Sequence, residues 1–311
     1  MNCRLLCAVA LFGVGLSASP LTLHQLNVGL GNCALIEVDG YHMLADAGPA
    51  NTMPSVYRYL VSQGVSTVDL LVVTHAHNDH FGGVAGLAAS GIVFRTVVDN
   101  DHITAPPLTA AETSAYYHAV GDRRAVITAG WWSTLGPATT VRCQYVNGVY
   151  ADGSTNNYAN ENDAAAIIEV RHGRFGHYFA ADTTTAIEGR GGLLCGPVNS
   201  LTAGHHGSSD ATSQAFLDTI RPRAVFISNP ANNSSMPGSN ALNRMYAAGA
   251  DVFLTQPPAD TRGFVRTNIV LVTDGETSFT VLPSNVYPLP EPGLFAVSIA
   301  ALHAFSRRRG T

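Results

Sequence analysis

The chain has 311 residues, of which 46% are hydrophobic and only 13% are charged. This composition excludes a disordered chain, and the length allows one large domain or two small ones. The mean hydropathy of +0.12, with apolar runs only at the two ends, excludes a protein with many membrane spans. All 17 basic residues are arginine, which excludes Schiff-base chemistry and a P-loop lysine. The formal net charge of −5 argues against a stable nucleic-acid complex, because nucleic-acid-binding proteins neutralise phosphates with basic side chains.

Residues 1–19 have the pattern of a secretory signal peptide. Arg4 precedes the apolar stretch Leu5–Leu16, and small residues follow at 17–19. The alternative is a buried first helix. Cleavage near residue 19 leaves three cysteines, which allow at most one internal disulfide, at positions Cys33, Cys143 and Cys195.

Between the two ends, residues 20–286 predict one domain in which strands and helices are interspersed. The N-terminal half predicts strands at Leu21–Val28, Cys33–Val38 and Tyr41–Ala45, a helix at Pro54–Gly64, a strand at Leu70–Val73, a helix around Leu87, a strand at Val93–Val98 and a helix at Ala110–Val120. The C-terminal half predicts strands at Ala164–Val170, Tyr178–Ala181 and Val198–Thr202, a helix at Ser213–Ile220, a strand at Ala224–Ser228, a helix at Asn240–Ala248, and strands at Val252–Thr255, Phe264–Thr273 and Phe279–Leu282. This order indicates a layered α/β sandwich.

The strongest functional signal is segment 74–80, Thr-His-Ala-His-Asn-Asp-His, directly after an apolar strand. Residues two apart project to the same side of an extended segment, so His75 and His77 can reach one ion. Asp79 and His80 lie beyond the turn and can face a second ion. Imidazole and carboxylate together favour Zn²⁺ or a similar divalent ion such as Mn²⁺. The alternative is a histidine-rich surface loop.

The spacing His-x-His-x-Asp-His resembles the signature of the metallo-β-lactamase fold, which implies a four-layer αββα sandwich. In this resemblance, Asp46 corresponds to an aspartate that orients a metal-binding histidine from behind. Asp182 corresponds to the aspartate that bridges two metals, with Ala181 in place of the usual glycine. The alternative for Asp182 is an isolated loop carboxylate.

Residues Gly204–Ser208 match the last histidine motif of that fold. The resemblance implies that one of its two histidines is a metal ligand. We expect His206 to be that ligand and His205 to contact the substrate or transfer a proton, although the sequence leaves the reverse assignment open.

Residues 27–32 resemble the element that opens the hydrolase domain of the competence channel protein ComEC. The sequence departs from that branch at Leu30, at Asn32, which replaces an aspartate, and at Met236. The third histidine motif of lactamases and lactonases is absent, and Asn162 or Asp163 occupies that stretch. We expect Asn162 to support the ligands from behind, and one or two ions to be bound.

The resemblance implies an exported metal-dependent hydrolase that attacks phosphoester or phosphodiester bonds with metal-activated hydroxide. Asp79 and His205 are the expected catalytic residues, in addition to the ligands. Two alternatives remain, which are a lactone or β-lactam hydrolase and a non-enzymatic surface or matrix protein that retains the fold. The Trp131–Trp132 pair either belongs to the core or lines a cleft in which aromatic rings stack on sugars or bases.

The C-terminal segment 287–311 contains Pro290-Glu291-Pro292, the apolar run Leu294–Phe305 and three arginines. This arrangement resembles the PEP-CTERM sorting signal, which implies transient membrane anchoring and cleavage by an exosortase-type protease. The protein would then be periplasmic, on the cell surface or extracellular in a Gram-negative bacterium. The alternative is an ordinary C-terminal anchor helix.

Overall fold

The structure is a computed structural model, and it describes residues 19–103, 108–230, 235–256, 267–275 and 278–283. Nearly all of the predicted signal peptide and the whole of the predicted sorting tail lie outside these ranges. Within them, no helix has both the length and the apolar character needed to cross a membrane.

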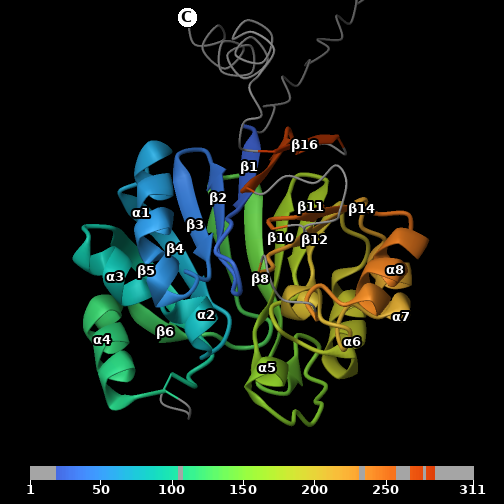
Figure 1. Cartoon of the computed structure of the whole chain (residues 1–311), viewed down its shortest axis with the longest axis horizontal. Helices are drawn as coiled ribbons and strands as arrows, with labels where there is room; N and C mark the ends of the chain where they lie inside the picture. The colour runs from blue at the N-terminus through green and yellow to red at the C-terminus, as the bar shows by residue number, and fades with distance from the viewer. Residues whose placement is uncertain (1–18, 104–107, 231–234, 257–266, 276–277, 284–311) are drawn as a thin grey trace, which may run out of the picture.

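Two β-sheets pack face to face, and helices cover the outer face of each sheet (Figure 1). The first sheet contains, in spatial order, β16 (Phe279–Pro283), β15 (Ile269–Thr273), β1 (Leu21–Gln25), β2 (Ala34–Val38), β3 (Tyr41–Ala45), β4 (Thr67–Val73), β5 (Val93–Asp99) and β6 (Arg124–Val126). The second contains β14 (Asp251–Leu254), β13 (Ala224–Ile227), β12 (Ser200–Thr202), β11 (Phe175–Phe179), β10 (Ile167–His172), β8 (Thr139–Val146) and β7 (Trp132–Leu135), with β9 (Val149–Tyr150) paired to β8. The predicted αββα sandwich is therefore confirmed.

The helices fall into three groups. The first sheet is covered by α1 (Met53–Ser62), α3 (Val84–Ala89) and α4 (Ala110–Val120), and the second by α6 (Thr185–Cys195), α7 (Gln214–Ile220) and α8 (Ser239–Ala247). The short helices α2 (Asn78–Phe81) and α5 (Glu161–Ala164) lie toward one end of the sandwich, whereas β16 lies toward the other (Figure 1). Single turns of 3-10 helix occur at η1 (Ala50–Thr52), η2 (Gly121–Arg123) and η3 (Gly204–Gly207).

The core is layered because the central strands are apolar on both faces. In β2, Ile36 packs between the sheets, while its neighbour Leu35 packs under the helices of the first sheet. In β10, Ile168 packs between the sheets and Ile167 packs under the helices of the second sheet. A fully buried side chain of this size contributes about 1.5–3 kcal/mol. The sandwich is thus rigid enough to hold loops at fixed positions on its rim.

Most predicted elements occur within a few residues of their predicted bounds, and β3 and α4 have the predicted bounds. The predicted strand Ala164–Val170 was wrong at its start, since Ala164 ends α5 and β10 begins at Ile167. Strands β6 to β9 and helices α2, α5 and α6 were not predicted. In β8 the signal was present, because apolar Val141, Cys143 and Tyr145 alternate with polar side chains.

Candidate metal centre

The histidine-rich segment leaves the first sheet at the end of β4 and turns into α2. Two contacts from the second sheet's side hold its backbone in place. The Ala76 N–H donates to Glu161 Oε1 at 2.8 Å, and the Ala166 N–H donates to the Thr74 carbonyl at 2.8 Å. Beyond α2, a Cβ added to Gly83 would lie 2.3 Å from the Ala47 carbonyl oxygen, so only glycine fits there. The segment is therefore clamped on both sides.

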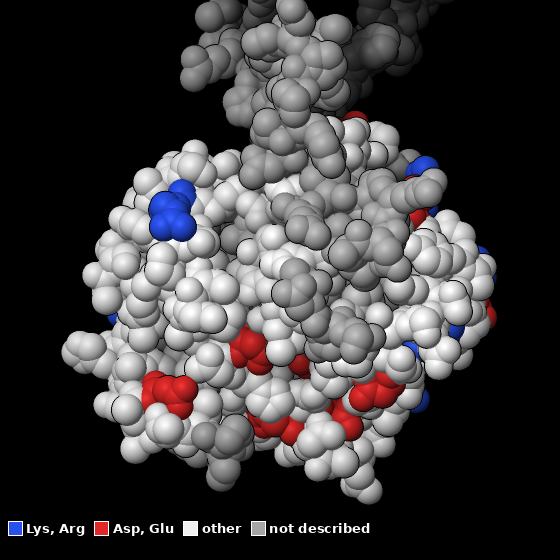
Figure 2. Space-filling view, viewed as in Figure 1, with Lys and Arg blue, Asp and Glu red and all other residues white. Residues whose placement is uncertain are grey.

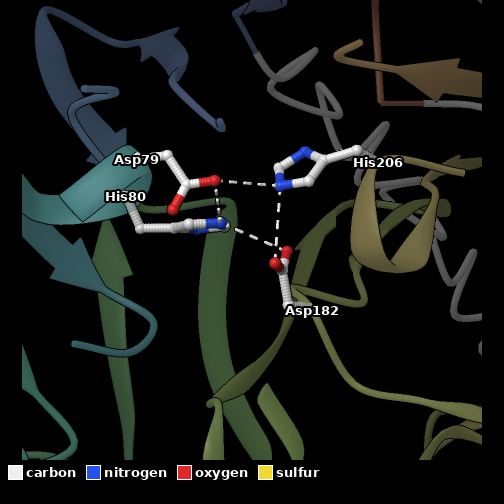
Figure 3. Close-up of side chains that lie close together, drawn as sticks. All are labelled: Asp79, His80, Asp182 and His206. Carbon is white, nitrogen blue, oxygen red and sulfur yellow. Dashed lines mark ion pairs between the residues drawn. The ribbon is translucent and has the colours of Figure 1, made fainter. Parts of the chain in front are cut away.

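Four predicted ligands form the first group, which is shown in Figure 3. His80 Nε2 lies 3.2 Å from Asp182 Oδ1. His206 Nε2 lies 3.3 Å from Asp79 Oδ2 and 3.4 Å from Asp182 Oδ2. Side chains from α2, from the turn after β11 and from η3 thus face one point.

His75, His77 and Asp182 form a second group. His75 Nε2 lies 3.1 Å from His77 Nδ1 and 3.9 Å from Asp182 Oδ2. In each group the potential ligand atoms lie within 4.8 Å of one another. Asp182 belongs to both groups, which is the arrangement expected of a bridging carboxylate and argues against an isolated loop carboxylate.

His80 and His206 each direct one ring nitrogen toward the cluster, and the other ring nitrogen of each contacts a protein oxygen. His80 Nδ1 lies 2.7 Å from Asp46 Oδ2, and His206 Nδ1 lies 3.2 Å from the Ser228 carbonyl oxygen. Among the described residues, the Nε2 atoms of His80 and His206 are buried and lack a partner in hydrogen-bond geometry. Metal-binding histidines are typically held in this way by the nitrogen that faces away from the metal. The donor set of imidazoles and carboxylates therefore fits a divalent ion such as Zn²⁺ or Mn²⁺.

Asp46 lies behind His80, with its Oδ2 2.7 Å from His80 Nδ1. Its Oδ1 accepts from the Thr74 N–H at 2.8 Å, and its Oδ2 accepts from Thr74 Oγ1 at 3.0 Å. Asn32 Nδ2 also donates to Asp46 Oδ2 at 3.1 Å, and Gln25 Nε2 donates to Asn32 Oδ1 at 2.9 Å. An aspartate at position 32, as in the ComEC branch, has no such donor when ionised. Asn32 therefore helps to hold the Asp46 carboxylate.

Strained turns place the ligands of the second sheet. His205 and His206 have φ values of 48° and 53°, and Ala181 has a φ of 51°. These left-handed conformations cost non-glycine residues about 1–3 kcal/mol each. At Ala181 this conformation explains why the related motif usually has glycine. At η3 the turn directs His206 into the cluster and leaves His205 outside both groups.

His205 is held beside the cluster, with its ring centroid 6.2 Å from that of His206. Its Nε2 lies 3.2 Å from Asn162 Nδ2, and its Nδ1 lies 3.2 Å from Asp210 Oδ1. Asn162 was expected to support a metal ligand, but its hydrogen bond in the described structure goes to His205. The reason is that α5 points the Asn162 amide toward η3, while the neighbouring Asp163 accepts from Thr184 Oγ1 at 2.8 Å.

Sequence reasoning missed Glu161, which fixes the loop that carries His75 and His77. Besides the Ala76 N–H, Glu161 Oε1 accepts from Asn100 Nδ2 at 2.9 Å. Its Oε2 lies 2.7 Å from His102 Nδ1. No spacing template in the sequence links Glu161 to these partners, because the contacts join residues 59 to 85 positions apart.

The electrostatics keep the two aspartates of the first group ionised. Burial opposes ionisation of Asp182, but His206 and His80 outweigh it and hold the pKa of its carboxyl well below the usual range. Burial likewise opposes protonation of His206, yet Asp182 raises the pKa of its imidazole to about 9. Burial lowers the pKa of His75 most, and the nearby His80 lowers it further. Without an ion, the first group therefore holds protonated histidine against carboxylate.

A cavity of about 450 Å³ lies beside Asp79 of the first group. Its lining includes Val28, Leu30, Pro49, Thr52, Asp79 and Gln256. Acidic side chains gather on this face toward the end where α2 and α5 lie, while arginines lie toward its margin (Figure 2). The described residues that line this cavity include no arginine, so they offer no positive charge to a polyanion.

The metallo-β-lactamase superfamily model matches residues 26–135. A curated relative, Recombination protein 2 of Haemophilus influenzae, is 24% identical over 249 residues, covering 78% of this chain. The aligned part is 28% of that relative, so this chain spans less than a third of its length.

Solved structures give the same fold. The metallo-beta-lactamase fold protein YhfI from Bacillus subtilis is 12% identical with a TM-score of 0.51, over 76% of this chain and 97% of that one. Igni18, a metallo hydrolase from Ignicoccus hospitalis, is 16% identical with a TM-score of 0.51, over 80% of this chain and 98% of that one. The chain thus has the metallo-β-lactamase fold, and the predicted class of metal-dependent hydrolase is supported.

Proposed function

We propose that this chain of the metallo-β-lactamase fold is an exported hydrolase of phosphodiester or phosphoester bonds. One observation carries the hydrolase assignment, namely the two groups of imidazole and carboxylate donors that share Asp182 at the rim of the sandwich. The substrate class is supported by the ComEC-like elements of the sequence and by the 24% identity with Recombination protein 2. The fold by itself does not define a reaction, because related scaffolds carry different chemistries.

The residues of the two groups would each bind an ion. His75, His77 and Asp182 would hold one ion, and Asp79, His80, Asp182 and His206 would hold another. When bound, the ions supply Lewis acidity toward a phosphoryl oxygen and a hydroxide nucleophile at neutral pH. Asp79 lines the cavity, so its carboxylate meets the substrate side of the cluster.

His205 would contact the bound substrate rather than an ion. Its ring is 19% exposed and is fixed at both nitrogens by Asn162 and Asp210. A ring oriented in this way can form a hydrogen bond to a substrate oxygen without first losing rotational freedom.

The missing third histidine favours phosphodiesters over lactones and β-lactams. Asn162 lies in the stretch of the chain where that histidine motif would be, and its side-chain amide contacts His205 rather than His75 or His77. The second group then has three protein donors among the described residues, which leaves room for substrate oxygens. A lactone or β-lactam hydrolase remains the second candidate, since the fold is also that of such enzymes.

The test is to measure metal content and hydrolysis of bis-p-nitrophenyl phosphate and nitrocefin by the purified chain. We expect at least one equivalent of Zn²⁺ or Mn²⁺ and turnover of the diester only. Asp182→Asn should abolish turnover and reduce metal content, whereas Asp218→Asn, an exposed aspartate on α7, should change neither. Turnover of nitrocefin without the diester would favour the second candidate. A folded, metal-loaded chain that hydrolyses neither substrate would favour the non-enzymatic alternative.

Export and processing rest on the two terminal segments of the sequence. We propose cleavage near residue 19, transient anchoring through Leu294–Phe305 and removal of the tail by an exosortase-type protease. Mass spectrometry of the protein from its host should then find neither end. Recovery of an intact C-terminus at Thr311 from a host with an exosortase would favour the alternative, an ordinary C-terminal anchor helix. The acidic face in Figure 2 supports the further expectation of no stable nucleic-acid complex.

A further inference from the structure

Outside both metal-binding groups, the outer face of the second sheet carries an unusual group of side chains. Strand β7 pairs with β8 so that Trp132 lies directly opposite Arg142. Residues opposite each other in antiparallel strands project from the same face, so these two side chains are neighbours. Trp132 is 66% exposed, whereas Trp131 packs against the core between the sheets. The pair is thus neither simply core nor part of the metal-site cleft.

A cavity of about 310 Å³ lies on this face and is lined in part by Arg142, the cross-strand neighbour of Trp132. It is lined by Thr140, Arg142, Glu169, Arg171, Leu194 and Cys195. None of these residues belongs to either metal-binding group. The volume is at the lower end of the range for small-molecule sites, which suits a single ring.

The charges in this cavity do not cancel. Glu169 Oε1 pairs with Arg171 Nε, and Glu169 Oε2 accepts from Gln144 Nε2. Arg171 also donates to the carbonyls of Cys195, at 2.7 Å, and Pro197, at 3.1 Å. Arg171 is therefore fully engaged and neutralised by Glu169.

Arg142 is different, because within the described residues it has no ion pair, hydrogen bond or stacked ring. Its cross-strand neighbour on β10 is Glu169, each of whose oxygens already accepts one hydrogen bond from another residue. One guanidinium thus remains available beside an exposed indole, in a chain whose net charge is −5. An unpaired arginine fork matches a carboxylate in a bidentate manner.

We propose that this cavity binds an acidic saccharide, with the ring stacked on Trp132 and the carboxylate paired with Arg142. The Thr140 hydroxyl can hydrogen-bond to sugar hydroxyls, and the remaining lone pairs of Glu169 can accept from them. A single free guanidinium suits a monoanion. A phosphate dianion would meet the Glu169 carboxylate with only one free positive partner, so a nucleotide is disfavoured.

The test uses the full chain in a mild detergent, titrated calorimetrically with a trigalacturonate and with a neutral glucose trisaccharide. We expect the acidic sugar to bind about tenfold or more tightly than the neutral one, since a charge-assisted contact is worth that much. Trp132→Ala and Arg142→Gln should each weaken binding about tenfold or more, and Trp132→Phe should retain most of it. High salt should weaken binding by the wild-type chain but not the residual binding by Arg142→Gln.

The matched control is Arg95→Gln, because Arg95 is an exposed arginine of the first sheet, paired with Asp69 at 2.8 Å. It should bind the acidic sugar as the wild type does. Metal content and thermal melting should be unchanged in all four variants, since these side chains are at the surface and outside the metal centre. Failure of trigalacturonate to bind at millimolar concentration would overturn the proposal. So would binding that survives both Trp132→Ala and Arg142→Gln, or uridine monophosphate binding in place of the sugar.

Discussion

Helix α6 contains three glycines, and two of them can be compared directly by replacement with alanine. A Cβ at Gly192 would lie 2.7 Å from Phe216 Cδ2 and 3.0 Å from Ile220 Cγ2, both in α7. A Cβ at Gly189, in the same helix, would have no neighbouring atom within 4 Å. Neither glycine has a positive φ. The two sites therefore differ in packing while sharing helical backbone.

The expected magnitudes follow from two opposing effects. Alanine in place of an interior helix glycine stabilises the fold by about 1 kcal/mol. Overpacking a filled interface costs about 1–3 kcal/mol. Gly189→Ala should thus raise the free energy of unfolding by about 1 kcal/mol, while Gly192→Ala should leave it unchanged or lower it by up to about 2 kcal/mol. The two variants should differ in their free energy of unfolding by about 1–3 kcal/mol. This difference isolates the steric effect, because both substitutions gain the same helix propensity.

Urea unfolding followed by circular dichroism measures this difference, and melting temperatures should differ by about 2–4 °C per kcal/mol for a domain of this size. If Gly192→Ala is as stable as Gly189→Ala, α6 does not pack on α7 as closely as described, and the steric role given to Gly192 is wrong.

Three further predictions concern the site and the core. Asp46→Asn should weaken zinc binding about 10–100-fold in chelator competition, because the amide holds His80 less strongly than the carboxylate does; unchanged affinity would contradict the role given to Asp46. Glu161→Ala should cost about 1–3 kcal/mol of stability, because it leaves the buried Ala76 N–H without an acceptor, and a neutral result would show that this clamp is dispensable. Burial lowers the pKa of His177 to about 3, so between pH 6.5 and 3 only the unfolded state takes up this proton. This proton alone should then lower the free energy of unfolding by about 1.4 kcal/mol per pH unit below pH 6.5. In urea titrations at several pH values, His177→Gln should show a pH dependence of stability that is shallower by that amount. An equal pH dependence in the variant and the wild type would contradict the prediction.

The sequence by itself indicated the fold class and the candidate ligands of segment 74–80. Apolar strands with period two, helix caps and the spacing of residues 74–80 are local features, so they can be read without knowing the tertiary structure. The bounds of β3 and α4 followed from such patterns. The same is true of His75, His77, Asp79 and His80, which one short segment brings together.

Only the tertiary structure decided what depends on contacts between distant segments. Helix α6 was missed because its glycines lower helix propensity, whereas in the fold one of them, Gly192, lets α6 approach α7. The choice of His206 over His205 depends on left-handed backbone at η3, which packing maintains and no local pattern reveals. The contacts of Glu161 with Ala76 and His102 join segments that meet only when the two sheets pack. Sequence patterns report local preference, whereas strain, close approach and cross-sheet hydrogen bonds exist only after the sandwich has formed.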